Sequence, residues 1–251
     1  RSQELIPAKV TLRDYNWETP RVSLKNDLSV GDRAVTGTYY EYGANYKDEN
    51  EGKILAQTRT EEILSKQIVV RGESNARSLR AGGTFQLEDH PRSDMNAAWL
   101  LTKIESEGVQ PDERSDKRMP RFESTFSAIP ADREFRPERR TPRPRIDGLL
   151  TAHVDAGSSG EYAEIDKHGR YRVALPFDDA KTGNAATHWV RMMQPSTGAD
   201  HGSHIGLNVG CEVAIAHRRG DPDEPIIVAT LPNKDSASVV AKGNNTQSII
   251  R

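Results

Sequence analysis

Glycine and proline divide the second half of the chain into short segments, and this spacing limits the possible folds more than any other feature. The clearest turn is Gly220-Asp-Pro-Asp. Its glycine can take a positive φ, its proline fixes its own φ, and its aspartates can accept hydrogen bonds from nearby backbone amides. A buried strand over residues 224–230 is expected to follow. The pattern predicts a small β-barrel that leads into a tail.

Five candidate strands between residues 145 and 233 alternate apolar and polar side chains, as half-buried strands do. They cover residues 149–154, 171–175, 187–193, 212–216 and 225–230. Five short strands joined by glycine-rich turns are typical of the OB-fold, a five-stranded, partly open barrel. We expect an antiparallel barrel whose interior includes Val173, Leu175, Trp189, Val213, Ile215 and Ile227.

The first 135 residues predict another β-rich region with one substantial helix. Alternating side chains favour strands over residues 5–12, 35–42, 68–71, 85–88 and 99–107. Residues 111–133 are charged and punctuated by proline, and no strand is assigned to them. Acidic residues near position 50 suit the start of a helix that extends to residue 66. Its helically spaced residues are Ile54, Leu55, Thr58, Glu62 and Ile63.

Residues 135–144 contain three prolines and four arginines. Proline lacks an amide donor and restricts the residue before it, so residues 136–145 are expected to be an extended connector at a domain boundary. Two interpretations of its arginines remain open. They belong either to a solvated linker or to a connector that packs against neighbouring chains.

The charge balance excludes a global field that would attract nucleic acid or an anionic membrane, because 35 Lys and Arg face 37 Asp and Glu. Cys211 is the single cysteine, which excludes an internal disulfide and a cysteine-based zinc cluster. We interpret it as a small apolar strand residue, with a reactive thiol as the alternative. No segment has the pattern of a membrane span or a cleavable export signal. The chain begins with Arg1 and not Met, so we expect a longer natural protein.

No catalytic, cofactor-binding or metal-binding residue is assigned, and no cofactor is expected. His201 and His204 have the spacing of metal ligands on a helix, but the surrounding glycines make a helix improbable and favour a surface loop. The segment Gly157-Ser-Ser-Gly160 lacks the Gly-Lys-Ser ending of a phosphate loop, and Ser203 is not in a nucleophile elbow. A glycosidase pair could be drawn only from carboxylates in predicted turns, namely Asp155, Glu161, Glu164, Asp166, Asp178 and Asp179.

Single-strand nucleic-acid binding is the second function class that an OB-fold raises, because such proteins combine a basic groove with aromatic platforms. Tyr171 and Trp189 fall within alternating strand patterns, where packing is the commoner role of such rings. The other candidates are Tyr162 and Phe177 with Arg170, Arg172, Arg191, Arg218 and Arg219. The near-neutral charge balance weighs against this function, and no nucleic-acid partner is expected.

Several motifs stand in an order that resembles VgrG, the spike protein family of type VI secretion, and more distantly the central spike of contractile phage tails. The segments that carry this resemblance are Val10-Thr-Leu-Arg-Asp-Tyr-Asn, residues 72–91, residues 135–146, Asp166-Lys-His-Gly-Arg-Tyr-Arg-Val-Ala-Leu-Pro-Phe-Asp and Trp189-Val-Arg-Met-Met-Gln-Pro. The resemblance implies a mainly β fold, with a β-barrel hub segment, an OB-fold barrel and the start of an intertwined trimeric β-helix needle. The expected boundaries are 1–135 for the hub, 136–144 for the linker, 145–233 for the barrel and 234–251 for the needle.

The function that this resemblance implies is mechanical and not enzymatic. Three copies would cap an inner tube of Hcp-like protein, hold a PAAR-like tip protein and effectors, and contact baseplate components. The spike would assemble in the bacterial cytoplasm and leave the cell on firing, without inserting into a membrane itself. The alternatives are the spike of a phage tail or phage-like particle, a peptidoglycan-cleaving spike enzyme and a nucleic-acid-binding OB protein.

Overall fold

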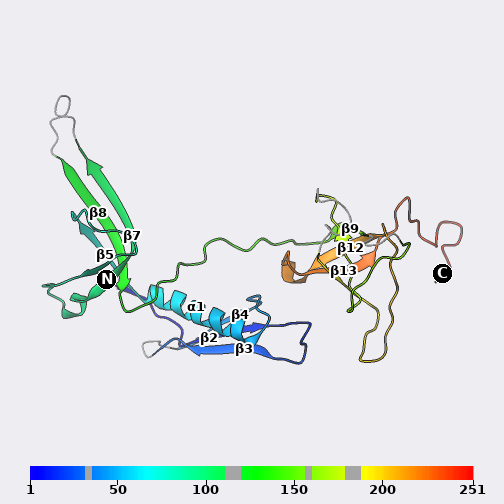
Figure 1. Ribbon diagram of the computed structural model, residues 1–251, viewed down its shortest axis with the longest axis horizontal. Helices are drawn as coiled ribbons and strands as arrows, with labels where there is room; N and C mark the ends of the chain where they lie inside the picture. The colour runs from blue at the N-terminus through cyan, green and yellow to red at the C-terminus, as the bar shows by residue number, and fades with distance from the viewer. Residues whose placement is uncertain (32–35, 111–119, 156–159, 179–187, 251) are drawn as a thin grey trace. The chain divides into compact units, whose positions relative to one another are not determined.

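The computed structural model describes residues 1–31, 36–110, 120–155, 160–178 and 188–250, and it divides the chain into two compact units, residues 1–140 and 141–251 (Figure 1). Each unit has apolar core clusters of its own. Across these described ranges, no helix has the length and apolar character needed to cross a membrane. The expected residues Thr187 and Asp179 lie outside them, as do Val35 and most of the segment 157–160.

A three-stranded sheet and a helix form one part of the amino-terminal unit. β2 (Lys9–Asp14) lies in the centre, antiparallel to β3 (Leu24–Ser29) and parallel to β4 (Thr38–Tyr42). Helix α1 (Glu49–Gln67) runs along the sheet and shares a core with it (Figure 1). The buried core residues are Ile6, Val10, Leu12, Leu24, Val30, Ala44, Tyr46 and Ala56. The two expected amino-terminal strands are present with shifted ends, and β3 was not expected.

The expected helix is confirmed, and of its helically spaced residues Glu62 is buried and Leu55 and Ile63 pack against the core. The helix begins after Asp48, whose carboxylate accepts hydrogen bonds from the amides of Asn50 and Glu51 at 2.8 and 2.9 Å. Ile54 is 66% exposed, whereas the small residues Gly52 and Ala56 face the sheet. A Cβ at Gly52 would lie 2.7 Å from a ring carbon of Tyr46. The helix therefore approaches the sheet too closely for a large apolar face.

An antiparallel five-stranded sheet forms the other part of this unit. Its strand order is β1 (Ser2–Gln3), β5 (Ile68–Ser74), β8 (Arg121–Pro130), β7 (Ala98–Val109) and β6 (Thr84–Gln86). A short 3-10 turn, η1 (Ser93–Met95), precedes β7. The sheet buries Ile68, Val70, Met95, Trp99, Leu101 and Ala128. Rings of Phe85 and Phe126 meet edge to face at 5.4 Å.

The segment to which no strand was assigned contains β8, the second longest strand described. Pairing with β7 creates this strand, because residues 121–130 bond to residues 99–109 in register along nearly their whole length. Ser124 is buried and its hydroxyl lies 2.8 Å from that of Ser106 on β7. Charged residues such as Glu123 stay exposed on the other face. A long-range partner thus overrides the weak local signal.

The carboxy-terminal unit is a five-stranded barrel. The sheet order is β10 (Val173–Ala174), β9 (Leu150–Val154), β12 (Glu212–His217), β13 (Pro225–Thr230) and β11 (Arg191–Met192). Tyr171 and Val190, beside the two outer strands, exchange backbone hydrogen bonds of 2.9 and 2.7 Å. These two bonds join the edges of the sheet and close the barrel. A 3-10 turn, η2 (Arg218–Gly220), connects β12 to β13.

The barrel interior matches the expected residues except at one strand. Val173, Val213, Ile215 and Ile227 are buried, and Leu175 packs against them half-buried. Trp189 was expected inside, but Val190 is the buried residue and the guanidinium of Arg172 lies 4.5 Å from the centre of the Trp189 ring. A shift of one residue in a strand exchanges its two faces. The expectation of an entirely antiparallel barrel is also wrong, since β11 runs parallel to β13.

The needle stays a prediction. Residues 231–250 contain no strand in the described structure, and Ile250 is fully exposed.

Replacing Gly52 by Ala should lower the stability of the chain by about 1–3 kcal/mol, although alanine favours helices, because the new methyl group would overlap Asn26 and Tyr46. Chemical denaturation followed by far-UV circular dichroism measures this effect. Exposed Ile54 provides the control, and Ile54→Ala should change stability by less than about 0.5 kcal/mol. A more stable Gly52→Ala variant would contradict the close helix–sheet approach.

Candidate functional site

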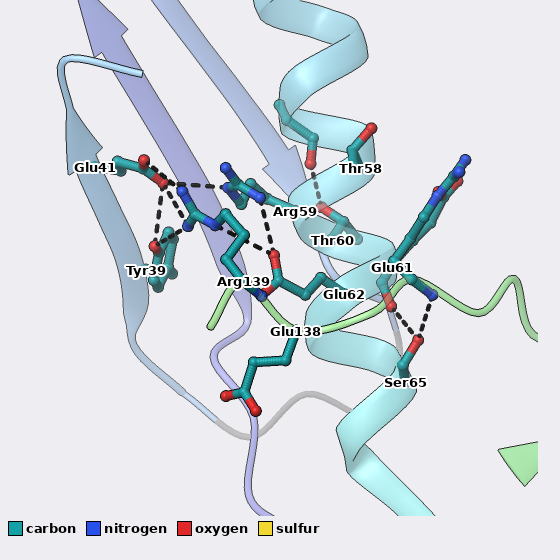
Figure 2. A network of polar contacts seen from close by, with 12 residues as sticks. Tyr39, Glu41, Thr58, Arg59, Thr60, Glu61, Glu62, Ser65, Glu138 and Arg139 are labelled. Atoms are coloured by element: carbon teal, nitrogen blue, oxygen red, sulfur yellow. Dashed lines mark hydrogen bonds and ion pairs between the residues drawn. The ribbon is translucent and has the colours of Figure 1, made fainter. Parts of the chain in front are cut away.

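Charged side chains from three separate parts of the sequence meet in the amino-terminal unit (Figure 2). Arg139, from the segment expected to be a linker, places Nη1 and Nη2 3.0 and 3.1 Å from the two carboxylate oxygens of Glu41 on β4. Its Nη2 also donates to the hydroxyl of Tyr39 at 3.0 Å. Arg59 on α1 bridges Glu41 and Glu62 at 3.3 and 2.9 Å. We call these five residues the Glu41 cluster.

Neighbouring contacts extend this attachment along helix α1. Arg136 donates from Nε to Glu61 at 2.7 Å and from its amide to the Ser65 hydroxyl at 3.1 Å. Lys66 pairs with Glu138 at 2.7 Å, and Arg133 donates to the Leu64 carbonyl at 2.9 Å. An arginine at a helix carboxy terminus is favourable, because unpaired carbonyls carry partial negative charge there. Residues 133–139 are therefore docked on the amino-terminal unit.

The arginines keep the carboxylates of this region ionised. Burial raises the pKa of Glu41, but hydrogen bonds and charge from Arg139, together with the charge of Arg59, lower it more, so that the pKa lies below its ordinary value. The hydrogen bond from Arg136 likewise lowers the pKa of Glu61. Burial raises the pKa of Tyr39, which stays a neutral hydroxyl. The cluster thus consists of satisfied ion pairs and offers no group poised for proton transfer.

The histidines considered as metal ligands have structural partners in the carboxy-terminal unit. His204 Nε2 lies 3.0 Å from the hydroxyl of Tyr171, a ring that is 1% exposed, and His204 Nδ1 lies 3.4 Å from Gln194. The Tyr171 hydroxyl also accepts from the Leu207 amide at 3.2 Å. The His201 ring lies directly over Gly198. Within the described ranges, no three His, Cys, Asp or Glu side chains gather as metal ligands would.

Of the carboxylates considered as a glycosidase pair, Asp179 lies outside the described residues, and the other five have different surroundings. Asp166 stabilises a turn, accepting from the amides of His168 and Arg170 at 2.9 Å each and from Arg170 Nε at 2.7 Å. Burial raises the pKa of Asp166, but these hydrogen bonds lower it more, which keeps the carboxylate ionised and unable to serve as a protonated general acid. Glu161 and Glu164 are exposed. Asp155 is buried, and Asp178 is exposed at the end of β10.

The side chains considered for nucleic-acid binding do not form one basic aromatic groove. Tyr162 and Phe177 are exposed, but Tyr171 is buried in the barrel. Carboxylates neutralise several of the arginines: Arg170 pairs with Asp166, and Arg218 and Arg219 both pair with Glu224. Sequence reasoning missed these pairs and the Glu41 cluster. The four arginines after Phe135 were the one available signal.

Glu41→Gln should lower the free energy of unfolding by about 1–2 kcal/mol at pH 7, because it leaves Arg59 and Arg139 without their shared carboxylate. Glu138→Gln, at a more exposed pair, is the control and should cost less than Glu41→Gln. A depressed carboxyl pKa contributes stability above the unfolded value of about 4.3 and loses it as the pH falls through the folded value. The difference between wild type and Glu41→Gln, measured in urea titrations, should therefore shrink as the pH falls below about 4.3. Equal losses for the two variants at pH 7 would contradict the central place of Glu41.

Comparison with protein families gives one match in each unit. Residues 1–111 match the phage tail baseplate hub family, and residues 162–231 match the type VI secretion system/phage-baseplate injector OB domain. The hub thus precedes the OB domain in one chain.

Curated relatives cover nearly the whole chain. It is 32% identical to the type VI secretion system spike protein VgrG1c of Pseudomonas aeruginosa, over 93% of this chain and 33% of the relative. It is 31% identical to the actin cross-linking toxin VgrG1 of Vibrio cholerae, over 88% of this chain and 20% of the relative. The chain therefore spans about a fifth to a third of the length of these relatives.

Solved structures of type VI secretion proteins are also similar to this chain. The E. coli c3393 protein, a type VI secretion component similar to the T4 tail proteins gp27 and gp5, matches 74% of this chain and 45% of its own with a TM-score of 0.52 and 29% identity. A Francisella PdpA–VgrG complex covers 97% of this chain and 43% of its own with a TM-score of 0.50 and 9% identity, and shares the fold. The chain is thus similar to VgrG-type spike proteins across nearly its whole length, with a hub region followed by an OB region and about 30% identity to the curated relatives.

Proposed function

We propose that this chain is the hub-to-barrel part of a type VI secretion spike that punctures a target envelope. The observation that carries this proposal is the succession of a baseplate-hub region and an injector OB region within a chain related to VgrG spike proteins over more than nine-tenths of its residues. Neither region alone distinguishes a spike from other β-rich proteins. Their combination supports a mechanical function.

The physical properties of the two units support such a function. The barrel closes on itself through Tyr171 and Val190, which removes the free strand edges at which sheets associate without specificity. The charged side chains of the Glu41 cluster bind one another, so they hold the connector and have no catalytic geometry. We therefore propose a structural protein whose described part takes no part in catalysis.

The partners follow from the same assignment. Three copies would wind about a common axis, cap the stacked rings of an Hcp-like inner tube and carry a PAAR-like tip protein and effectors. Residues 234–251 would begin the needle by pairing with the same segment of two other copies, which would bury Ile250. The spike would assemble in the cytoplasm with baseplate components and leave the cell on firing. A contractile phage tail or phage-like particle is the alternative, because the OB family spans both systems.

A chimera tests the proposed function. Residues 1–251 replace the matching region of VgrG1c in a P. aeruginosa strain whose other VgrG proteins are deleted, and the Hcp released into the medium is measured. We expect the chimera to have a trimer mass by light scattering and to restore Hcp release. Ile227→Asp, which places a charge in the barrel core, is the control and should abolish both. A trimeric chimera that releases no Hcp would overturn the type VI assignment.

A peptidoglycan assay tests the absence of catalysis. Purified chain should release no soluble muropeptides from cell-wall sacculi between pH 4 and pH 8, because Glu161 and Glu164 are solvated and Asp166 is engaged in a turn. Activity that disappears in Glu161→Gln or Glu164→Gln would support the spike-enzyme alternative instead. Asp166→Asn also breaks the turn, so its loss of activity counts only if its circular dichroism spectrum is unchanged.

A further inference from the structure

The arginine- and proline-rich connector is held at both of its ends, each end within its own unit. On the amino-terminal side, Arg136 and Arg139 donate six hydrogen bonds to residues of α1 and β4. On the carboxy-terminal side, the amide of Ile146 donates to the Gly220 carbonyl at 2.9 Å. Arg143 Nη1 lies 3.8 Å from Asp221, a side chain that is only 15% exposed.

Gly220 makes the second attachment possible. Its φ is 75°, and a Cβ at this position would lie 3.2 Å from Asp147 Oδ1 and 3.3 Å from Arg145 Nε. Connector side chains therefore lie over the bare Cα of the glycine, at a distance that a larger residue would obstruct. The turn that the sequence marks as the start of a strand is also the surface on which residues 143–147 dock.

Between these two attachments the chain is unsupported. Thr141 and Pro142 are exposed and make no hydrogen bond or ion pair in the described structure. The side chain of Arg140 is 86% exposed, and its one ion pair, at 3.8 Å, is with Glu138 of the connector itself. Pro142 fixes its own φ and keeps Thr141 out of the α region. The freedom of the connector is thus concentrated at residues 140–142.

We infer that the connector is a docked strap with a single short joint at residues 140–142, and not a flexible linker over residues 136–144. A flexible linker and a short joint differ greatly in the distance that the free part of the chain can span. A flexible nine-residue chain has a root-mean-square length of roughly 16 Å and samples many directions. Three residues span at most about 10 Å even when extended. This inference does not depend on the proposed secretion function, since it concerns only how the chain is attached to each unit.

Amide hydrogen exchange, measured residue by residue by NMR on the whole chain, tests the inference. The amides of Arg136, Arg139 and Ile146 should exchange at least about tenfold more slowly than those of Arg140 and Thr141, after correction for intrinsic rates. Equal exchange at all five amides would overturn the docked strap. Slow exchange at Thr141 would overturn the joint.

Two variants separate the two attachments. Glu41→Gln should speed exchange at Arg139 by about tenfold and leave Ile146 unchanged, whereas Glu138→Gln should leave both unchanged. Gly220→Ala should speed exchange at Ile146 and leave Arg139 unchanged. Because alanine is strained at a φ of 75°, Asp221→Asn provides a milder second variant with the same expected direction. If Glu41→Gln speeds exchange at Ile146 as much as at Arg139, the attachments are not independent and the inference fails.

Discussion

Two backbone hydrogen bonds between Tyr171 and Val190 convert an open five-stranded sheet into a barrel, and the rest of the carboxy-terminal unit depends on this closure. The outer strands β10 and β11 have only two residues each, so neither could stay paired on its own. Closure also brings the Tyr171 ring into the core, where its hydroxyl must find polar partners. His204 and the Leu207 amide supply them. His204, one of the two histidines that resemble a metal site in the sequence, is therefore explained by one buried tyrosine.

The long strands of the barrel could be predicted because the local sequence of each strand is enough to indicate it. β9 alternates core and surface residues, β12 buries three successive residues, and the expected ranges of β9, β12 and β13 differ from the observed ones by one residue or none. The strand next to Trp189, β11, is too short to show a burial pattern of its own. One face holds Val190 and the other holds Trp189, and only the position of Arg172 over the indole decides between them. Hydrophobicity alone favours the larger ring for the core, and it gives the wrong register.

Long-range contacts account for the other differences. β8 has few apolar residues, yet its pairing with β7 gives its backbone N–H and C=O groups hydrogen-bond partners and places Ala128 in the core. Helix α1 presents Gly52 and not Ile54 to the core, because Tyr46 from the loop before the helix and Asn26 on β3 already fill the space beside Gly52. The Glu41 cluster joins residues 98 positions apart, and a spacing that long carries no periodic signal. Composition could identify the arginines of the connector but not the carboxylates that bind them.

The two units use different kinds of contact, and this difference has a consequence for how each responds to acid. The barrel is closed by backbone hydrogen bonds, and backbone amides and carbonyls do not titrate. The strap is held to the amino-terminal unit by Glu41 and Glu61, whose pKa values the arginines depress. Their contribution is complete above the unfolded pKa and is lost as the pH falls through the folded value. Acid should therefore weaken the attachment of the strap to the amino-terminal unit, and the joint at residues 140–142 would then lengthen toward the full connector.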